Sequence, residues 1–311
     1  MRSDLAFGEP PRGSSSHPAM QVATRRREWI EFHDHRLCPG FLRDLLTDAL
    51  EAIWNYTNCY RVIVPRLRLA MTEAATHRIV DLCSGGGGPW IRLREQFVTA
   101  EGFEVSVSLT DKYPNERAFT RLCAAQGVES YRAPVDARQI PVDLDGFRTI
   151  FSAFHHFNPH EARAILADAV MRHQGIAVFE PAKCSVRRLL ATTVLPLLCW
   201  RVTPRMKPFH WSRILWTYLL PVVPLTLFID GVLSCLRAYS LEDLRQLAEG
   251  LGGDEYRWEM GEQGGGRIGI TYLIGIPSIP SEQRDSLFLR CRSADNKGPQ
   301  SSASAALRVT E

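Results

Sequence analysis

The chain has 311 residues, of which 45% are hydrophobic and 23% are charged, and its formal net charge at pH 7 is +3. This is the composition of a globular protein, long enough for one large domain with additions or for two small ones. The small net charge argues against a non-specific nucleic-acid binder, and we predict no specific nucleic-acid partner. The eight cysteines are scattered without a C-x-x-C pair. We therefore expect a reducing compartment, no disulfide framework and no metal site.

The two ends of the chain are predicted to be disordered tails. Residues 1–24 are rich in Gly, Pro and Ser and have no apolar periodicity, and residues 281–311 are polar and of low complexity. The N-terminal stretch contains no apolar signal-peptide core, and Asp4 and Glu9 are unlike a transit peptide. These features predict a cytoplasmic protein.

Residues 25–75 are predicted to form a helical cap. Apolar residues recur every three or four positions from Phe41 to Trp54, which is the spacing of one helix face. A second helix is expected over Ile63 to Ala74, with Pro65 tolerated in its first turn.

A glycine-rich turn follows this cap in residues 78–90, RIVDLCSGGGGPW. Ile79, Val80 and Leu82 are an apolar run typical of a buried strand, and the four glycines 85–88 precede a segment that looks helical. A strand that enters a helix through glycines is typical of a ligand-binding turn, since a Cβ there would strain the turn or collide with the ligand. The alternative, a flexible linker, is disfavoured by the strand directly before it.

Two ligand classes compete for this turn. The dinucleotide fingerprint G-x-G-x-x-G fails, because Trp90 stands where the third glycine is needed after Gly85 and Gly87. Asp81, Gly85 and Gly87 instead resemble motif I of the class I S-adenosylmethionine-dependent methyltransferases, usually D-x-G-x-G-x-G, with Cys83 in place of the first glycine. The resemblance implies that S-adenosyl-L-methionine is the cofactor. It also implies that the glycines pass its methionine part, and that Asp81 fixes the turn and the amino end of the ligand.

Two further acidic residues continue this pattern. The alternating segment Phe103 to Leu109 predicts a strand, and Asp111 follows its tip, where a carboxylate can accept hydrogen bonds from both ribose hydroxyls. A short strand is expected over residues 129–133. The resemblance implies that Asp136 after it accepts from the adenine amino group and that the backbone near Ala137 binds the ring. Asp143 and Asp145 are alternatives to Asp136, and each of the three acids can also be a solvated loop residue.

The candidate catalytic residues follow the fourth and fifth expected strands. His155 and His156 come after Phe147 to Phe154, and Glu180 ends the strand Gly175 to Pro181. A histidine base is useful where the methyl acceptor is a hydroxyl. We therefore name His156 and His155 as candidates and Glu180 as a second-tier one. The alternative is that the histidines only line the pocket, as is widespread in the resembled family. The string F-N-P-H is interpreted as a helix cap, with Asn158 before Pro159 and Glu161.

The predicted fold class is α/β, a doubly wound, mostly parallel seven-stranded sheet of class I methyltransferase type in residues 76–280. Helices are expected over residues 161–173 and from Tyr239 to Leu251, with Ser240 as a cap. Residues 255–260 and 268–276 are expected to form the final strand pair, which the resembled family joins as an antiparallel hairpin. Helices before motif I pack over the cofactor in that family, although the helices 25–75 can also simply cover the sheet.

An apolar helical insert, residues 185–236, separates the fifth strand from the last helix. Its two apolar runs, Leu189 to Trp200 and Ile214 to Ile229, flank a basic connector without an acid. A transmembrane hairpin is disfavoured by the short first run, by the prolines in the second, and by the basic loop that it would export. The insert is then a lid over a lipophilic pocket or a monotopic element at a membrane surface. A helical pair buried against the fold or in a dimer interface remains as a further alternative.

The leading functional hypothesis is a methyltransferase that transfers a methyl group from S-adenosyl-L-methionine to a small-molecule or lipid-like acceptor. The protein is expected to be cytoplasmic, and residues 185–236 are the candidate for a peripheral contact with a membrane. The alternative is a non-catalytic, methyltransferase-like scaffold that uses this insert for membrane or partner association. A nicotinamide oxidoreductase ranks third, and an RNA methyltransferase is not encouraged by the charge. The sequence specifies neither the acceptor nor the oligomeric state.

Overall fold

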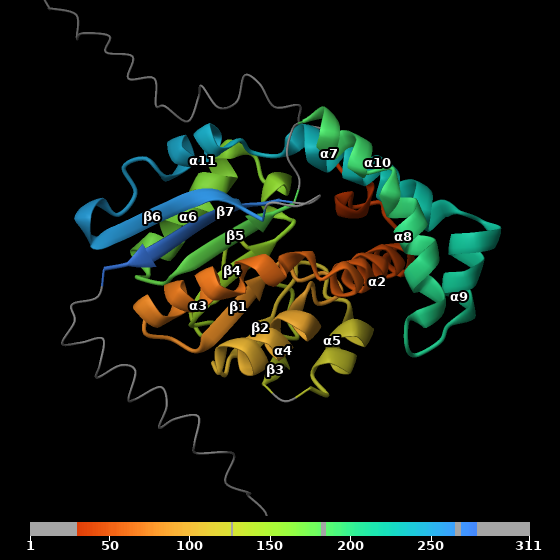
Figure 1. The fold of residues 1–311 in the computed structure, drawn as a ribbon, viewed down its shortest axis with the longest axis horizontal. Helices are drawn as coiled ribbons and strands as arrows, with labels where there is room; N and C mark the ends of the chain where they lie inside the picture. The colour runs from red at the N-terminus through yellow and green to blue at the C-terminus, as the bar shows by residue number, and fades with distance from the viewer. Residues whose placement is uncertain (1–29, 126, 182–184, 265–268, 279–311) are drawn as a thin grey trace, which may run out of the picture.

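The computed structural model describes residues 30–125, 127–181, 185–264 and 269–278. Both predicted tails, 1–24 and 281–311, and the first residues of the predicted cap lie outside this part of the chain. Figure 1 shows an α/β body joined on one side to a group of helices.

The body is built on a seven-stranded sheet. Its strands follow the order β3-β2-β1-β4-β5-β7-β6, and all neighbours are parallel except β7, which runs antiparallel to β5 and β6. This arrangement confirms the predicted doubly wound sheet and its antiparallel final pair. The strands are β1 (Arg78–Leu82), β2 (Ser106–Leu109), β3 (Val128–Ser130), β4 (Phe147–Phe151), β5 (Ile176–Glu180), β6 (Tyr256–Gln263) and β7 (Ile270–Pro277).

Helices cover both faces of the sheet, as parallel strands buried on both sides require. Successive strand residues point to opposite faces, so Ile79 packs in one core and Val80 in the other. The first core includes side chains of α3 (Val64–Glu73), α4 (Trp90–Glu101) and α5 (Glu116–Leu122). The second includes those of α6 (Pro159–Met171) and α11 (Leu241–Ala248).

The expected helix caps are present. The Asn158 side chain accepts from the backbone N–H of Glu161, whose carboxylate accepts from the Asn158 N–H in return. This capping box places Pro159 in the first turn of α6. Ser240 and Asp243 form the same arrangement at the start of α11. The F-N-P-H string is therefore a helix start, as predicted.

A third core joins the N-terminal helix to the insert. Helix α2 (Gly40–Thr57) packs against α8 (Val194–Val202) and α10 (Val222–Arg237) through Leu42, Leu46, Cys199, Val223 and Leu227. Between α8 and α10 lie the 3₁₀ segment η4 (Thr203–Arg205), α9 (Trp211–Ile214) and the π-helical segment η5 (Leu215–Leu219), and α7 (Val186–Ala191) precedes α8. The remaining 3₁₀ segments are η1 (Phe32–Asp34), η2 (Cys59–Ile63), η3 (Phe154–His156) and η6 (Gly253–Glu255).

Within the described residues, no helix taken singly has the length and apolarity to cross a membrane, whereas the pair Trp211–Leu219 and Val222–Arg237, bent by 68°, meets both criteria together.

Candidate active site

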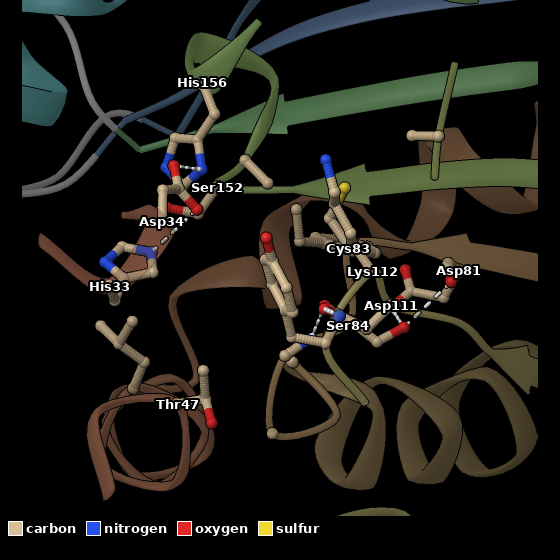
Figure 2. Close-up of a pocket in the computed structure, with 18 of the residues that line it drawn as sticks. His33, Asp34, Thr47, Asp81, Cys83, Ser84, Asp111, Lys112, Ser152 and His156 are labelled. Atoms are coloured by element: carbon tan, nitrogen blue, oxygen red, sulfur yellow. Dashed lines mark hydrogen bonds and ion pairs between the residues drawn. The ribbon is translucent and has the colours of Figure 1, made fainter. Parts of the chain in front are cut away.

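A cavity of about 290 Å³ lies at the carboxyl ends of β1, β2 and β4. The strand order reverses between β1 and β4, which is where open α/β sheets bind ligands. Figure 2 shows residues from the glycine turn, the N-terminal segment and the β4 end facing this cavity. Of the ten residues proposed from the sequence, seven line it: Asp81, Cys83, Gly85, Asp111, Asp136, Ala137 and His156.

Asp81 anchors the start of the glycine turn. Its carboxylate accepts from the Ser84 hydroxyl at 2.6 Å and from the Thr149 hydroxyl on β4, also at 2.6 Å. Burial raises the pKa of Asp81 to about 6, and the two hydroxyl donors limit the rise. Asp81 is therefore a buried, hydrogen-bonded acid that ties β1 to β4 at the cavity.

Asp111 closes the turn from the end of β2. Its Oδ2 accepts from the backbone N–H of Gly85 at 2.7 Å, and its Oδ1 accepts from the N–H of Tyr113, also at 2.7 Å. Burial raises the pKa of this carboxyl, and both amide donors oppose the shift. A carboxylate oxygen has two lone pairs, so each oxygen keeps one for a ligand.

The four glycines have different neighbours. Gly85, Gly86 and Gly88 line the cavity, whereas Gly87 does not. A Cβ on Gly87 would lie 1.9 Å from Cδ1 of Leu122 on α5, and its φ is +104°. Gly87 therefore allows α5 to pack against the turn, which differs from the contact with the methionine part that the resemblance implied for it.

Cys83 occupies the position where the resembled motif often has glycine. Its φ is +58°, in the left-handed region that favours glycine. The turn has thus kept the backbone conformation that glycine serves, with a side chain on it that faces the cavity.

Asp136 lies beside basic groups. Arg138 donates to its two oxygens at 2.8 and 2.6 Å, and the Lys112 ammonium lies 3.3 Å away. The Arg138 hydrogen bonds hold the pKa of Asp136 well below its usual range. Asp143 and Asp145 bond to Tyr131 and Gln174 and do not line the cavity. Of the three acids considered, Asp136 is the one at the site.

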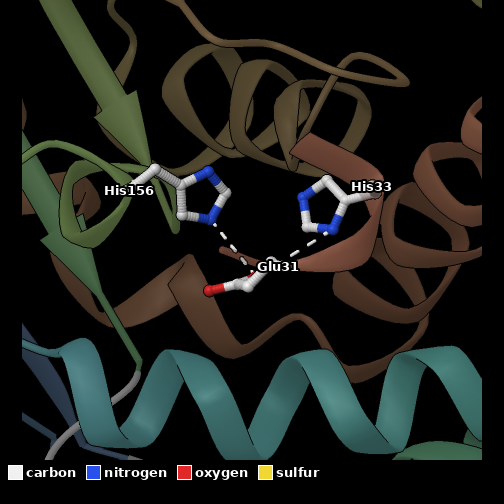
Figure 3. Close-up of side chains that lie close together, drawn as sticks. All are labelled: Glu31, His33 and His156. Atoms are coloured by element: carbon white, nitrogen blue, oxygen red, sulfur yellow. Dashed lines mark ion pairs between the residues drawn. The ribbon is translucent and has the colours of Figure 1, made fainter. Parts of the chain in front are cut away.

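His156 stands opposite the glycine turn, within a cluster of charged side chains. Its Nδ1 lies 2.7 Å from Asp34 Oδ2, and its Nε2 lies 3.4 Å from Glu31 Oε2. The His33 ring packs edge-on against it, with centroids 5.3 Å apart. Figure 3 shows Glu31 between the two imidazoles. Both nitrogens of His156 therefore face carboxylates.

His155 and Glu180 lie behind His156 and do not line the cavity. His155 Nδ1 lies 2.8 Å from Glu180, and its Nε2 lies 3.1 Å from Glu31. Glu180 also accepts from the backbone N–H groups of Phe154 and His155. These contacts fix the turn η3, and thereby the position of His156.

Both histidines are charged at neutral pH. Burial by itself lowers the pKa of His155, but Glu180 and Glu31 outweigh it and raise the pKa to about 9. Burial acts in the same direction on His156, and Asp34 and Glu31 likewise raise its pKa to about 9. In this state both ring nitrogens of His156 carry a hydrogen atom.

Among the residues at the site that the sequence interpretation missed are Glu31, His33, Asp34 and Glu51. The first three fall in the short string Glu31-Phe-His-Asp-His35, whose density of acids and histidines was the available signal. Glu51 sits on α2 among apolar residues and lines the cavity. Burial raises its pKa to about 7, although Arg121, 2.8 Å away, opposes the shift.

Glu31, His33 and His156 together have the composition of a metal site. The ligating atoms of Glu31, His33 and His156 all lie within 4.8 Å of one another, and two imidazoles with one carboxylate suit a transition metal. The sequence predicted no metal. In this structure the three groups, with Asp34 and Asp230, pair with one another.

The insert contacts the cavity wall without lining the cavity. No residue of 185–236 in the described part of the chain is among the lining residues. Helix α10 reaches the wall from behind: Asp230 lies 2.8 Å from His33 and accepts from the Phe32 N–H, and the Ser234 hydroxyl donates to Glu31. A second cavity, of about 710 Å³, lies between α2, α5 and residues 208–213.

No known family profile matches the chain, and no curated protein matches its sequence. Among solved structures it is similar to a pericyclic reaction enzyme, at 17% identity over 65% of this chain and 43% of that one (TM-score 0.39). It is similar to the plantazolicin methyltransferase solved with S-adenosylhomocysteine and a triazolic desmethyl analogue, at 10% identity over 82% and 88% (TM-score 0.41). It is also similar to human N-acetylserotonin methyltransferase in complex with S-adenosylmethionine, at 13% identity over 86% and 68% (TM-score 0.49).

The chain thus spans less than half of the length of the pericyclic enzyme. The fold is assigned from the strand order and directions alone. It is the fold of the class I S-adenosylmethionine-dependent methyltransferases.

Proposed function

We propose that the protein is a methyltransferase that uses S-adenosyl-L-methionine and acts on a small, partly apolar acceptor. The observation that carries the proposal is the hydrogen bond from the backbone N–H of Gly85 to the carboxylate of Asp111, in a cavity that Asp81 also lines. It joins the glycine turn and the acids at the ends of β1 and β2 in one cavity wall.

The chemistry of this wall fits the cofactor. Asp81 and Asp111 offer buried carboxylate oxygens to an ammonium group and to ribose hydroxyls. Cys83, Ala137 and Phe157 offer small or apolar surface to an adenine ring. A positively charged sulfonium is favoured beside carboxylates, and it supplies an activated methyl group when bound. Asp136 is less free to accept a hydrogen bond from the adenine amino group, because Arg138 already donates to both of its carboxylate oxygens.

The remaining walls favour a small acceptor with apolar and polar parts. Leu50, Trp54 and Phe151 are apolar, and His33, Asp34 and His156 are polar. Methyl transfer from a sulfonium mainly requires that nucleophile and methyl group are held in line and that water is excluded. The buried charged cluster behind His156 gives that wall a fixed geometry.

For an acceptor that must lose a proton, two residues are candidates. His156 remains the sequence candidate, but as a base it must first give up its own proton, which occurs near pH 9. Glu51 lines the same cavity with a pKa of about 7, which suits a general base at working pH. His155 and Glu180 act in this proposal as positioning residues.

The test is calorimetric titration of the purified chain with S-adenosylhomocysteine. We expect binding in the micromolar range, weakened about tenfold or more in Asp111→Ala, because a charged hydrogen-bond acceptor is lost. Asp143→Ala is the matched control, since this exposed acid does not line the cavity. A folded wild type that does not bind would contradict the proposal and favour the non-catalytic scaffold.

A further inference from the structure

The helices of the insert carry a concentration of exposed apolar side chains. Among the described residues, 26 large hydrophobic side chains are exposed, and 14 of them fall between Val186 and Ile229. Within the insert, Trp211 is the most exposed of these side chains, at 77%, followed by Leu219 and Val186 at 75% each. Isolated exposed hydrophobics are ordinary, but such a concentration marks an interaction surface.

The packing of the insert places these side chains on an outer face. Cys199 and Val202 of α8, with Val223 and Leu227 of α10, are buried in the core shared with α2. Val194 and Leu197 of α8, and Leu225 and Ile229 of α10, are exposed. Because the buried side chains point to α2, the exposed ones point away from the body. Figure 1 shows α8, α9 and α10 together on the side of the molecule away from β6.

Hydrogen bonds hold part of this face together. The indole N–H of Trp200 donates to the backbone oxygen of Thr217 at 3.1 Å, and the Tyr218 hydroxyl donates to the backbone oxygen of Trp200 at 2.5 Å. Trp200 and Tyr218, both partly exposed, therefore lie side by side on α8 and η5. Aromatic side chains with one polar end are favoured where hydrocarbon meets water.

The charges of the insert point to one class of partner. Residues 185–229 contain six basic residues and no acid. Arg187, Arg201, Arg205 and Lys207 are exposed, and Arg213 is buried in an ion pair with Asp48. A second copy of the chain would bring two basic faces together, which like-charge repulsion opposes. An anionic phospholipid surface complements both the apolar side chains and the positive charges.

We propose that the outer face of α7, α8, α9, η5 and the start of α10 is a monotopic attachment site for anionic lipid membranes. The exposed apolar side chains enter the acyl boundary, and the exposed basic residues of the insert add electrostatic attraction to anionic headgroups. The attachment does not depend on methyl transfer. It places α10, which contacts the wall of the cavity, directly at the lipid surface.

The test is flotation of the purified full chain with vesicles of phosphatidylcholine alone or with added phosphatidylglycerol. We expect flotation with the anionic vesicles, weaker flotation with the neutral ones, and a decrease at high salt. The variant Leu190→Glu/Trp211→Glu/Leu219→Glu, which changes only exposed side chains, should reduce the floated fraction about tenfold or more.

The matched control is Leu69→Glu/Val142→Glu/Met171→Glu, which adds the same charge at three exposed apolar positions outside the insert. It should float like the wild type. Binding of S-adenosylhomocysteine and the circular dichroism spectrum establish that each variant is folded, so failure of this proposal is distinguishable from failure of the proposed function.

Three results would overturn the proposal. The first is a wild type that stays at the bottom of the gradient with both vesicles. The second is equal flotation of the two triple variants. The third is a wild-type dimer that the insert variant dissociates while flotation is absent, since this outcome assigns the face to a second copy of the chain.

Discussion

His156 Nδ1 lies 2.7 Å from Asp34 Oδ2, although 122 residues separate them in the sequence. The contact joins the N-terminal segment η1 to the turn η3 after β4. It belongs to a cluster in which Glu31 forms ion pairs with His155 and His156. Charged groups that are buried and paired stabilise the fold only while they keep their charge. The pH dependence of stability is therefore a direct test of this cluster.

We expect the free energy of unfolding to fall as the pH rises from about 7 to about 10. The folded pKa values of His155 and His156, about 9, lie above the unfolded value of 6.5. Their contribution is thus complete below the unfolded pKa and is lost as the pH passes through the folded one. Each shift corresponds to about 2–3 kcal/mol at neutral pH. Urea titrations across this range measure the loss.

The variant His155→Gln identifies the source of this alkaline loss. It should be less stable than the wild type at neutral pH, but its stability should fall less between about pH 7 and about pH 10. His160→Gln, at an exposed position on α6, is the control and should follow the wild-type curve. An unchanged slope in His155→Gln would show that other groups cause the loss.

Gly87→Ala should destabilise the protein by about 2–4 kcal/mol, because strain from the positive φ adds to overpacking against Leu122. Gly102→Ala is the control: it also has a positive φ, but a Cβ there meets nothing within 4 Å, so about 1 kcal/mol is expected. In the double variant Gly87→Ala/Leu122→Ala the two losses should be less than additive. Additive losses would contradict the packing role of Gly87.

Cys83→Gly should stabilise the protein by about 1 kcal/mol relative to Cys83→Ala. Both variants remove the thiol, but only glycine relieves the left-handed backbone at φ +58°. Thermal unfolding of the two variants measures the difference. Equal melting temperatures would mean that the side chain at this position costs nothing in the turn.

Glu51→Gln should stabilise the protein above about pH 7 and have less effect near pH 5. The folded pKa of Glu51 is about 7 and its unfolded value is 4.5, so the wild type loses stability as the pH rises between these values. The amide carries no charge and removes this dependence. The same urea titrations decide the outcome, and Glu104→Gln, at an exposed position, serves as the control.

The positions of the sheet and of its acidic residues could be predicted because they depend on local signals. Strands such as β1 and β5 are short apolar runs. Asp81 lies in β1 itself, and Asp111 and Asp136 come shortly after β2 and β3 in the chain. Asp81, Asp111 and Asp136 accordingly all line one cavity. The capping box at Asn158 was also local, within four residues.

The polar wall of the cavity could not be predicted in the same way. Glu31 is recognisable as a site residue only when His155, Ser234 and Arg237 surround it, and these come from distant parts of the chain. The packing role of Gly87 likewise depends on a residue outside the turn, Leu122 of α5. For His155 and Glu180, proximity to a strand end did not reveal that they do not line the cavity.

Helix α10 carries Ile229 on its exposed side and Asp230, the next residue, against His33. One rigid element thus touches the outer face of the insert and the inner wall of the cavity. If a ligand in the cavity changes the tilt of α10, it changes the affinity of the outer face, and thermodynamic linkage then requires the reverse effect to be of equal size. The contacts of Asp230 with His33 and Phe32, and of Ser234 with Glu31, are those through which such a coupling energy would pass.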